Sequence, residues 1–140
     1  FEREERYPVD IVVFLQPTDI FRKRWMLEAA VRALLDDPHL ESAFVAYHDH
    51  KNYWRRVDSQ YVRVAPRDYR PRQLKEPLYR EDTGLACATR ASLIKQGRRL
   101  GDRVRIIENR DQVSGIDIHE EFDFWLAEQV LASGKRTVND

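Results

Sequence analysis

Short apolar runs and helix-like spacings alternate along the first third of the chain. Residues 9–15 form a nearly continuous run of β-branched and aromatic side chains, which is typical of a strand buried on both faces. Between residues 21 and 35 the apolar positions recur at helical spacing, and Thr18 or Asp19 is expected to be the N-cap of this helix. Residues 42–47 predict the next strand, parallel to the first through a right-handed crossover. The polar loop after the first strand therefore lies where open α/β sheets bind ligands.

The rest of the chain continues this alternation of strands and helices. Residues 60–65 alternate apolar and polar side chains and predict an edge or hairpin strand. The pattern as a whole predicts a single α/β domain over residues 1–140. Its remaining predicted elements are strands at 83–88 and 104–107, a short helix at 91–96 and a last helix at 119–132, ended by Gly134.

Composition narrows the possible partners and compartment. The 24 Lys and Arg residues balance 24 Asp and Glu residues, so the bulk charge does not indicate a nucleic acid or an anionic membrane as a partner. No apolar run approaches the roughly 20 residues of a membrane span, and no signal peptide is recognisable. Cys87 is the only cysteine, which excludes an intrachain disulfide and favours a reducing compartment. We therefore expect a soluble, cytoplasmic protein.

Polar side chains at two places are candidates for site residues. Asp117 precedes the last predicted helix, where it could cap the helix or present carboxylate oxygen to a hard cation. Gln16 and Thr18 directly follow the first strand and could face a ligand crevice. Turn chemistry and capping explain the spacing of all three equally well. The residues alone leave both interpretations open.

An aromatic-rich segment, residues 48–73, is predicted to be an excursion from the domain that mediates dimerisation, because aromatic residues are enriched at subunit interfaces. His48 and His50 would share one face if this segment is extended, an arrangement that could hold a metal. No third ligand is spaced nearby, so we expect solvated histidines at a strand end. The aromatic residues concerned are Tyr53, Trp54 and Tyr61.

Four motifs occur in the order seen in the acylneuraminate cytidylyltransferases, the CMP-sialic acid synthetase family, which the chain resembles from about residue 9 to 131. The resemblance implies a Rossmann-like nucleotide-diphospho-sugar transferase fold, with a mainly parallel sheet, flanking helices and an incomplete N-terminus. It also implies a reaction in which the anomeric hydroxyl of an acidic nine-carbon sugar attacks the α-phosphate of CTP and pyrophosphate leaves, with Mg²⁺ as cofactor. The motifs are residues 15–22, Arg72-Gln73, residues 79–84 and residues 114–128.

The resemblance also assigns roles to individual positions. Arg72 matches the Arg of an Arg-Gln pair beside the acceptor and phosphates, and Asp117 matches the first Asp of an Asp-Ile-Asp metal motif, which implies catalytic roles for both. The implied substrate-binding residues are Gln16 and Thr18 of a Gln-Pro-Thr turn, Gln73 and Ser114.

The chain departs from the family pattern at several positions. His119 stands where the second metal-binding Asp is expected, and imidazole is a poor ligand for Mg²⁺. Asp19 and Ile20 replace the usual Ser-Pro, and Ser114 comes one residue early. The five glycines are isolated, so the family's N-terminal phosphate loop is missing and we expect these 140 residues to be inactive alone. The alternatives are a cytidylyltransferase for 3-deoxy-octulosonate, pseudaminic or legionaminic acid, or a non-catalytic relative that binds sugar or nucleotide.

Overall fold

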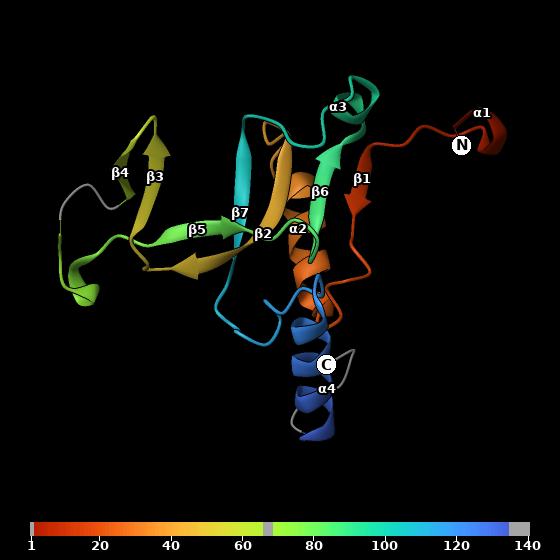
Figure 1. The fold of residues 1–140 in the computed structure, drawn as a ribbon. Helices are drawn as coiled ribbons and strands as arrows, with labels where there is room; N and C mark the ends of the chain where they lie inside the picture. The colour runs from red at the N-terminus through yellow and green to blue at the C-terminus, as the bar shows by residue number, and fades with distance from the viewer. Residues whose placement is uncertain (1, 66–68, 135–140) are drawn as a thin grey trace.

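A five-stranded mixed sheet organises the computed structural model, which describes residues 2–65 and 69–134 (Figure 1). Its strands are β1 (Ile11–Phe14), β2 (Ser42–Asp49), β5 (Leu78–Glu81), β6 (Cys87–Arg90) and β7 (Val104–Asn109). β7 pairs with one edge of β2 in parallel, whereas β6 and β5 pair with successive parts of the other edge in antiparallel orientation. β1 extends the sheet beyond β6. β2 is therefore the strand on which the sheet is built.

The α/β class is confirmed, but the expectation of a mainly parallel sheet is wrong for the described strands. Of their pairings in this sheet, β2 with β7 is parallel and the other three are antiparallel. β1 and β2 do run in the same direction, as the crossover predicts, because each pairs antiparallel with β6 between them. The sequence pattern could not show that a later strand is inserted between two strands joined by one helix.

β5 and β6 follow one edge of β2 as a single path that is interrupted at residues 82–86. Opposite these five residues stands Val45 alone, which accepts a hydrogen bond from the Asp82 N–H and donates one to the Ala86 carbonyl. A further hydrogen bond, from the Leu85 N–H to the Asp82 carbonyl, closes the interruption as a turn. The strand predicted at 83–88 therefore begins only at Cys87.

Helix α2 (Arg24–Asp36) covers one face of the sheet, as Figure 1 shows. Its buried residues Met26, Ala30 and Leu34 recur every four positions and pack with small residues of β2 and β6 in the main core. The predicted cap was wrong, because the helix starts after Lys23, whose side chain makes no capping hydrogen bond. Thr18 and Asp19 stay outside the helix and belong to the loop that follows β1.

The last helix, α4 (Glu121–Ala132), starts two residues later than predicted. Glu120 is its N-cap and forms a capping box with Asp123, whose carboxylate accepts the Glu120 N–H at 3.0 Å. Asp117 is therefore not the cap of this helix. The shorter helices are α1 (Glu2–Glu5), η1 (Arg72–Leu74) and α3 (Ala91–Lys95), the last close to its predicted range. Across residues 2–65 and 69–134, none of the helices has the length and apolarity needed to cross a membrane.

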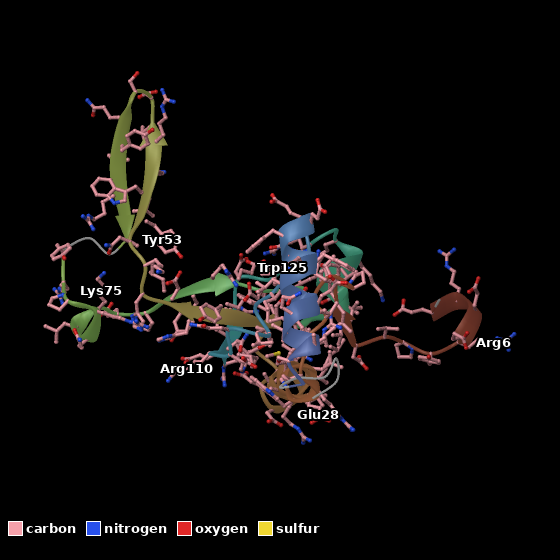
Figure 2. All side chains as sticks on the ribbon, turned by 60° about the horizontal axis from the view of Figure 1, so that its bottom comes forward. Arg6, Glu28, Tyr53, Lys75, Arg110 and Trp125 are labelled. Atoms are coloured by element: carbon pink, nitrogen blue, oxygen red, sulfur yellow. The ribbon has the colours of Figure 1, made fainter. Side chains whose placement is uncertain are left out.

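The predicted excursion contains a separate two-stranded hairpin, which confirms the hairpin strand at 60–65. β3 (Tyr53–Val57) pairs antiparallel with β4 (Gln60–Ala65), and nearly all of the side chains of both strands are exposed. Figure 2 shows the hairpin standing away from the main sheet, with Tyr53 at its base and Lys75 beyond it. The segment thus has the form of an arm, although whether it mediates dimerisation stays a prediction.

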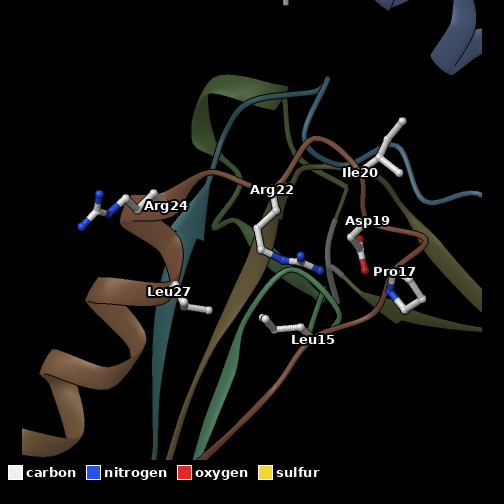
Figure 3. A pocket seen from close by; sticks show the side chains of 7 residues that line it. All are labelled: Leu15, Pro17, Asp19, Ile20, Arg22, Arg24 and Leu27. Atoms are coloured by element: carbon white, nitrogen blue, oxygen red, sulfur yellow. The ribbon is translucent and has the colours of Figure 1, made fainter. Parts of the chain in front are cut away.

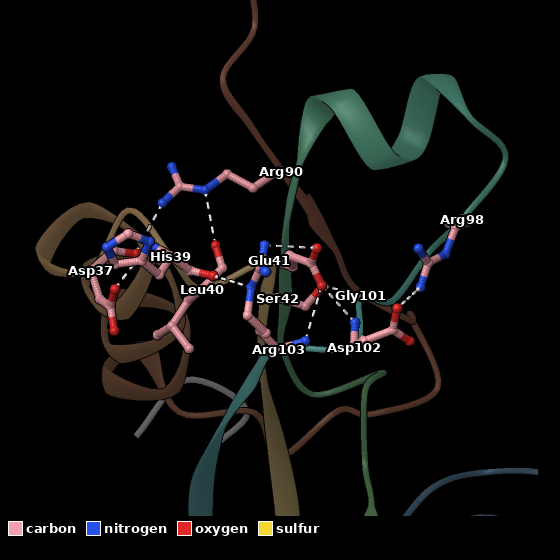
Figure 4. A network of polar contacts seen from close by, with 10 residues as sticks. All are labelled: Asp37, His39, Leu40, Glu41, Ser42, Arg90, Arg98, Gly101, Asp102 and Arg103. Carbon is pink, nitrogen blue, oxygen red and sulfur yellow. Dashed lines mark hydrogen bonds and ion pairs between the residues drawn. The ribbon is translucent and has the colours of Figure 1, made fainter.

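A network of polar contacts holds the connection between α2 and β2 (Figure 4). The guanidinium of Arg90 donates to the carbonyls of Leu34 at 2.6 Å, Asp37 at 3.1 Å and Leu40 at 3.1 Å, so it satisfies acceptors at the end of α2. The carboxylate of Glu41 accepts the N–H groups of residues 102 and 103 at 2.7 and 2.9 Å. These contacts fix the start of β2 against the loop before β7.

Replacing Arg90 by Leu should lower the free energy of unfolding by about 2 kcal/mol, because partly buried carbonyls lose a charged donor. Arg98→Leu is the matched control, since Arg98 pairs with Asp102 in solvent and such pairs contribute at most about 1 kcal/mol. Urea unfolding of both variants measures the difference. Equal losses would show that Arg90 is no more than a surface charge.

Candidate functional site

Two loops meet at the carboxyl ends of strands that run in the same direction. β1 and β7 are both parallel to β2, so the loop after β1 and the loop after β7 leave the sheet at the same edge. A hydrogen bond of 3.2 Å from the Ile118 N–H to the Thr18 carbonyl joins them. Residues almost a hundred positions apart, including Thr18 and Asp117, are thereby brought together as a candidate site.

Arg22 fastens the loop after β1 to the turn at residues 82–86. Its guanidinium donates to the carbonyls of Gln16 at 2.5 Å, Leu85 at 2.6 Å and Gly84 at 3.0 Å. The Gln16 N–H also donates to the Gly84 carbonyl at 2.9 Å. The loop that carries Gln16, Thr18 and Asp19 is thus fixed by main-chain contacts, which leave their side chains free for other partners.

Gly84 is required by this close approach. A Cβ atom at this position would lie 2.1 Å from Oδ2 of Asp19 and 2.3 Å from Oε1 of Gln16. Real Cβ atoms do not come so near to oxygen, so any other residue would push these side chains away. Two side-chain oxygens therefore converge over the one position in the turn that has no side chain.

Three buried oxygens at the meeting point of the loops receive no hydrogen bond from the described chain: Oγ1 of Thr18, Oδ2 of Asp19 and Oδ1 of Asp117. Asp19 is only 5% exposed. The pKa of Asp19 is raised to about 6, first by burial and then by the negative charge of Asp117, whereas Arg22 lowers it. Unpaired buried carboxylate oxygen is costly, which marks this place as one shaped for a ligand.

The other oxygen of Asp117 is occupied by an imidazole. Nε2 of His119 lies 2.6 Å from Oδ2 of Asp117, so His119 is a direct partner of this carboxylate. Asp82 is also occupied, because Arg80 contacts both of its oxygens at 3.1 and 3.2 Å. Oδ2 of Asp19 and Oδ1 of Asp117, in contrast, receive no hydrogen bond from the described residues.

Two hollows are lined by residues of the loops at this end of the sheet. The first is lined by Leu15, Pro17, Asp19, Ile20, Arg22, Arg24 and Leu27 (Figure 3). The second is lined mainly by Arg80, Asp82, Gly115, Asp117 and His119. Acidic oxygen and arginine nitrogen stand in both, which suits a ligand that carries negative groups together with a cation.

Other predicted site residues are not brought to this place. Arg72 and Gln73 lie on η1, exposed on the excursion, and Figures 1 and 2 both show this part of the chain well away from α4. Arg72 instead stands close enough to His50 to lower its pKa, after the larger effects of burial and of His48. Ser114 is fully buried, where its hydroxyl donates to Oδ1 of Asn109 and the Asp111 carbonyl. In this structure its hydroxyl shapes the loop and does not face a hollow.

The two histidines of the excursion do lie together. The rings of His48 and His50 pack edge to face with centroids 4.5 Å apart. The rings of His48 and Tyr79 also pack edge to face, with centroids 5.9 Å apart. Within the described ranges, no three or more His, Cys, Asp or Glu side chains are grouped so that they could hold a metal by themselves. Neither this pair nor the Asp19 region is therefore a complete metal cage of protein ligands.

The sequence does not predict the roles of Asp19 and Arg22 at the meeting of the two loops. It indicates Asp19 only as a possible helix cap and as a difference from the family turn, and Arg22 only as a member of the motif at residues 15–22. The signal was present in the pattern: a buried strand followed by Gln-Pro-Thr-Asp, with an arginine three positions after the acid. What it lacked was the turn at residues 82–86, which is distant in sequence.

Comparison with known proteins identified no relative by sequence. No protein-family model matches the chain, and no curated protein matches it in sequence.

The pH dependence of stability tests the burial of Asp19. Its pKa is higher in the folded chain than the ordinary 3.8, so folding binds a proton and stability falls as the pH rises from about 4 through about 6. Asp19→Asn should abolish this loss and raise the free energy of unfolding by about 2 kcal/mol at about pH 8, with little change near pH 4.

Chemical unfolding across this pH range, with a chelator present, provides the measurement. Asp102→Asn is the control, because the Asp102 side chain is 85% exposed and its removal should leave the pH profile unchanged. A profile for Asp19→Asn that parallels that of the unmodified chain would contradict the assignment.

Proposed function

We propose that this chain is the acceptor-sugar and metal-binding portion of a cytidylyltransferase that transfers CMP from CTP to a sialic-type acidic sugar and releases pyrophosphate. The observation that carries the proposal is the meeting of the loops after β1 and β7. There Gln16, Thr18 and Asp117, which match two separate family motifs, lie on segments joined by the hydrogen bond between Ile118 and Thr18. The motifs are far apart in sequence, so their meeting supports a shared role.

The donor set at the site fits Mg²⁺, the cofactor that the resemblance implies. The free oxygens of Asp117, Asp19 and Thr18 are hard donors, and Mg²⁺ takes one or two carboxylates and completes its shell with water and substrate phosphates. When bound, Mg²⁺ neutralises phosphate charge during phosphoryl transfer. His119 is held by Asp117 through its Nε2 and is assigned here as a partner that orients this carboxylate.

The remaining residues have roles that their chemistry supports. The amide of Gln16 and the hydroxyl of Thr18 can each donate and accept hydrogen bonds, as binding of a polyhydroxy sugar needs. Arg22 holds Gln16 through its carbonyl, and the Ile118 N–H holds Thr18 in the same way. Contact of Arg72 and Gln73 with the acceptor and phosphates stays a proposal that rests on the resemblance, because both lie on the excursion.

Pyrophosphate release from CTP with a panel of acidic sugars tests this function. We expect none from the 140 residues alone, because their isolated glycines form no phosphate loop. The same residues joined to the N-terminal nucleotide-binding segment of a CMP-sialic acid synthetase should release pyrophosphate, and Asp117→Asn should lower this rate at least about a hundredfold.

Asp102→Asn, on an exposed loop remote from the proposed chemistry, is the control and should keep the full rate. Turnover by the 140 residues alone, or an unchanged rate in Asp117→Asn, would falsify the assignment. The sugar that supports turnover separates sialic acid from 3-deoxy-octulosonate, pseudaminic and legionaminic acid, which the residues do not distinguish.

A second candidate is a non-catalytic relative that binds nucleotide or sugar without turnover. Two observations favour it. His119 stands where the family has its second metal-binding Asp, and its imidazole pairs with Asp117. Ser114 is buried. Isothermal titration with CTP separates the two. In an enzyme Mg²⁺ should strengthen CTP binding and Asp117→Ala should remove that coupling, whereas a binding protein should take up CTP equally with and without the metal.

We also propose that the excursion at residues 48–73 makes the chain a homodimer. The exposed apolar side chains of its hairpin include Trp54, Tyr61 and Val64, and Arg63 lies over the Trp54 ring at 4.6 Å. Exposed aromatic and arginine side chains together are typical of subunit interfaces.

Light scattering should give twice the chain mass for the unmodified protein, and the mass of one chain for Trp54→Ser with Tyr61→Ser. Trp25→Ser is the matched control, because Trp25 is about as exposed as Trp54 but lies on α2. A monomer at high concentration in the unmodified chain, or dissociation caused equally by Trp25→Ser, would contradict the role of the excursion.

A further inference from the structure

Asp19 is a buried carboxylate that neither the family pattern nor helix capping explains. It replaces a serine of the family turn, is only 5% exposed, and keeps Oδ2 without a donor from the described chain. A lone carboxylate rarely stays buried in this way, because its desolvation costs several kcal/mol unless a charge or hydrogen bonds compensate. A compensating cation is therefore expected at this oxygen.

The neighbouring positive groups provide only part of that compensation. The charge of Arg22 lowers the pKa of Asp19, but its guanidinium donates its hydrogen bonds to the carbonyls of Gln16, Gly84 and Leu85. Arg80 is engaged by both oxygens of Asp82. Neither donates a hydrogen bond to the free oxygen of Asp19.

The charge of His119 likewise compensates Asp19 only in part. The imidazole pairs with Oδ2 of Asp117, while Oδ1 of Asp117 is buried and without a donor, as is Oγ1 of Thr18. The charges of Asp19 and Asp117 act on one another, and the hydrogen bond from Ile118 to Thr18 ties the two segments together. The groups left over are oxygens only, and they carry two negative charges.

We infer that Asp19 and Asp117 together bind one divalent cation, with Asp19 supplying the carboxylate that position 119 lacks. This inference deepens the proposed function and rests on it for the reaction that the cation serves. An oxygen-only set with two carboxylates suits Mg²⁺ or Mn²⁺ and disfavours the softer metals that imidazole prefers. The second acid of the site thus comes from the loop after β1, and His119 is free to orient Asp117.

Manganese binding to the 140-residue chain tests this assignment without catalysis. Free Mn²⁺ is followed by electron paramagnetic resonance in a titration that reaches millimolar metal. The unmodified chain should bind one Mn²⁺, and Asp19→Asn and Asp117→Asn should each weaken binding at least about tenfold, since even residues behind the ligands cost that much. Mn²⁺ should also raise the melting temperature of the unmodified chain but not of Asp19→Asn.

Asp82→Asn is the matched control. It removes an equal charge from the same edge of the sheet, but Asp82 is paired with Arg80, so binding should change by less than about threefold. An equal loss in Asp82→Asn would show that general negative potential attracts the metal, and would overturn the inference. So would wild-type affinity in Asp19→Asn, or no Mn²⁺ bound by the unmodified chain.

The two proposals fail in different ways. If Asp117→Asn alone weakens Mn²⁺ binding, Asp19 is not a ligand, and the proposed cytidylyltransferase site keeps its metal residue. If Mn²⁺ binding behaves as expected but the joined chain releases no pyrophosphate with any sugar, the cation site stands and the proposed reaction is wrong.

Discussion

The guanidinium of Arg22 holds the site together, because it joins three carbonyls from two segments that have no regular pairing with one another. Gln16 lies in the loop after β1, whereas Gly84 and Leu85 belong to the turn that interrupts the pairing along β2. Partly buried carbonyls need donors, and a forked cation satisfies several at once. Without Arg22 the hydrogen bond from the Gln16 N–H to the Gly84 carbonyl would be left to join the loop after β1 to this turn.

The interruption at residues 82–86 does more than end a strand. It turns the backbone toward β1 at Gly84, where the missing side chain leaves room for oxygens of Gln16 and Asp19. It also places Asp82 and its partner Arg80 beside Asp117 and His119 in the second hollow. A break in regular pairing beside a strand end is a frequent way to aim side chains at a ligand.

The electrostatics of this edge run against stability. Asp19 is buried, its pKa is raised to about 6, and Asp117 adds a like charge nearby. A chain selected for stability alone would place a neutral residue there, so the cost points to a function that requires the acid. The remainder of the core is ordinary by comparison, with small side chains of β2 and β6 beneath Met26, Ala30 and Leu34.

The sequence by itself determined the α/β class, α2, the hairpin strand at 60–65 and the polar loop after β1, because periodicity and β-branched runs are local properties. It also identified Gln16, Thr18 and Asp117 as candidate site residues, but it did not decide between ligand binding and a role in turns and helix capping. Only the tertiary structure decided that β6 lies between β1 and β2, that Glu120 caps α4, and that the charge of Asp117 acts on Asp19. The strand order, the turn opposite Val45 and the environment of the buried acid depend on contacts between segments that are distant in sequence. The local spacing of residue types does not encode such contacts, so it could not predict these features.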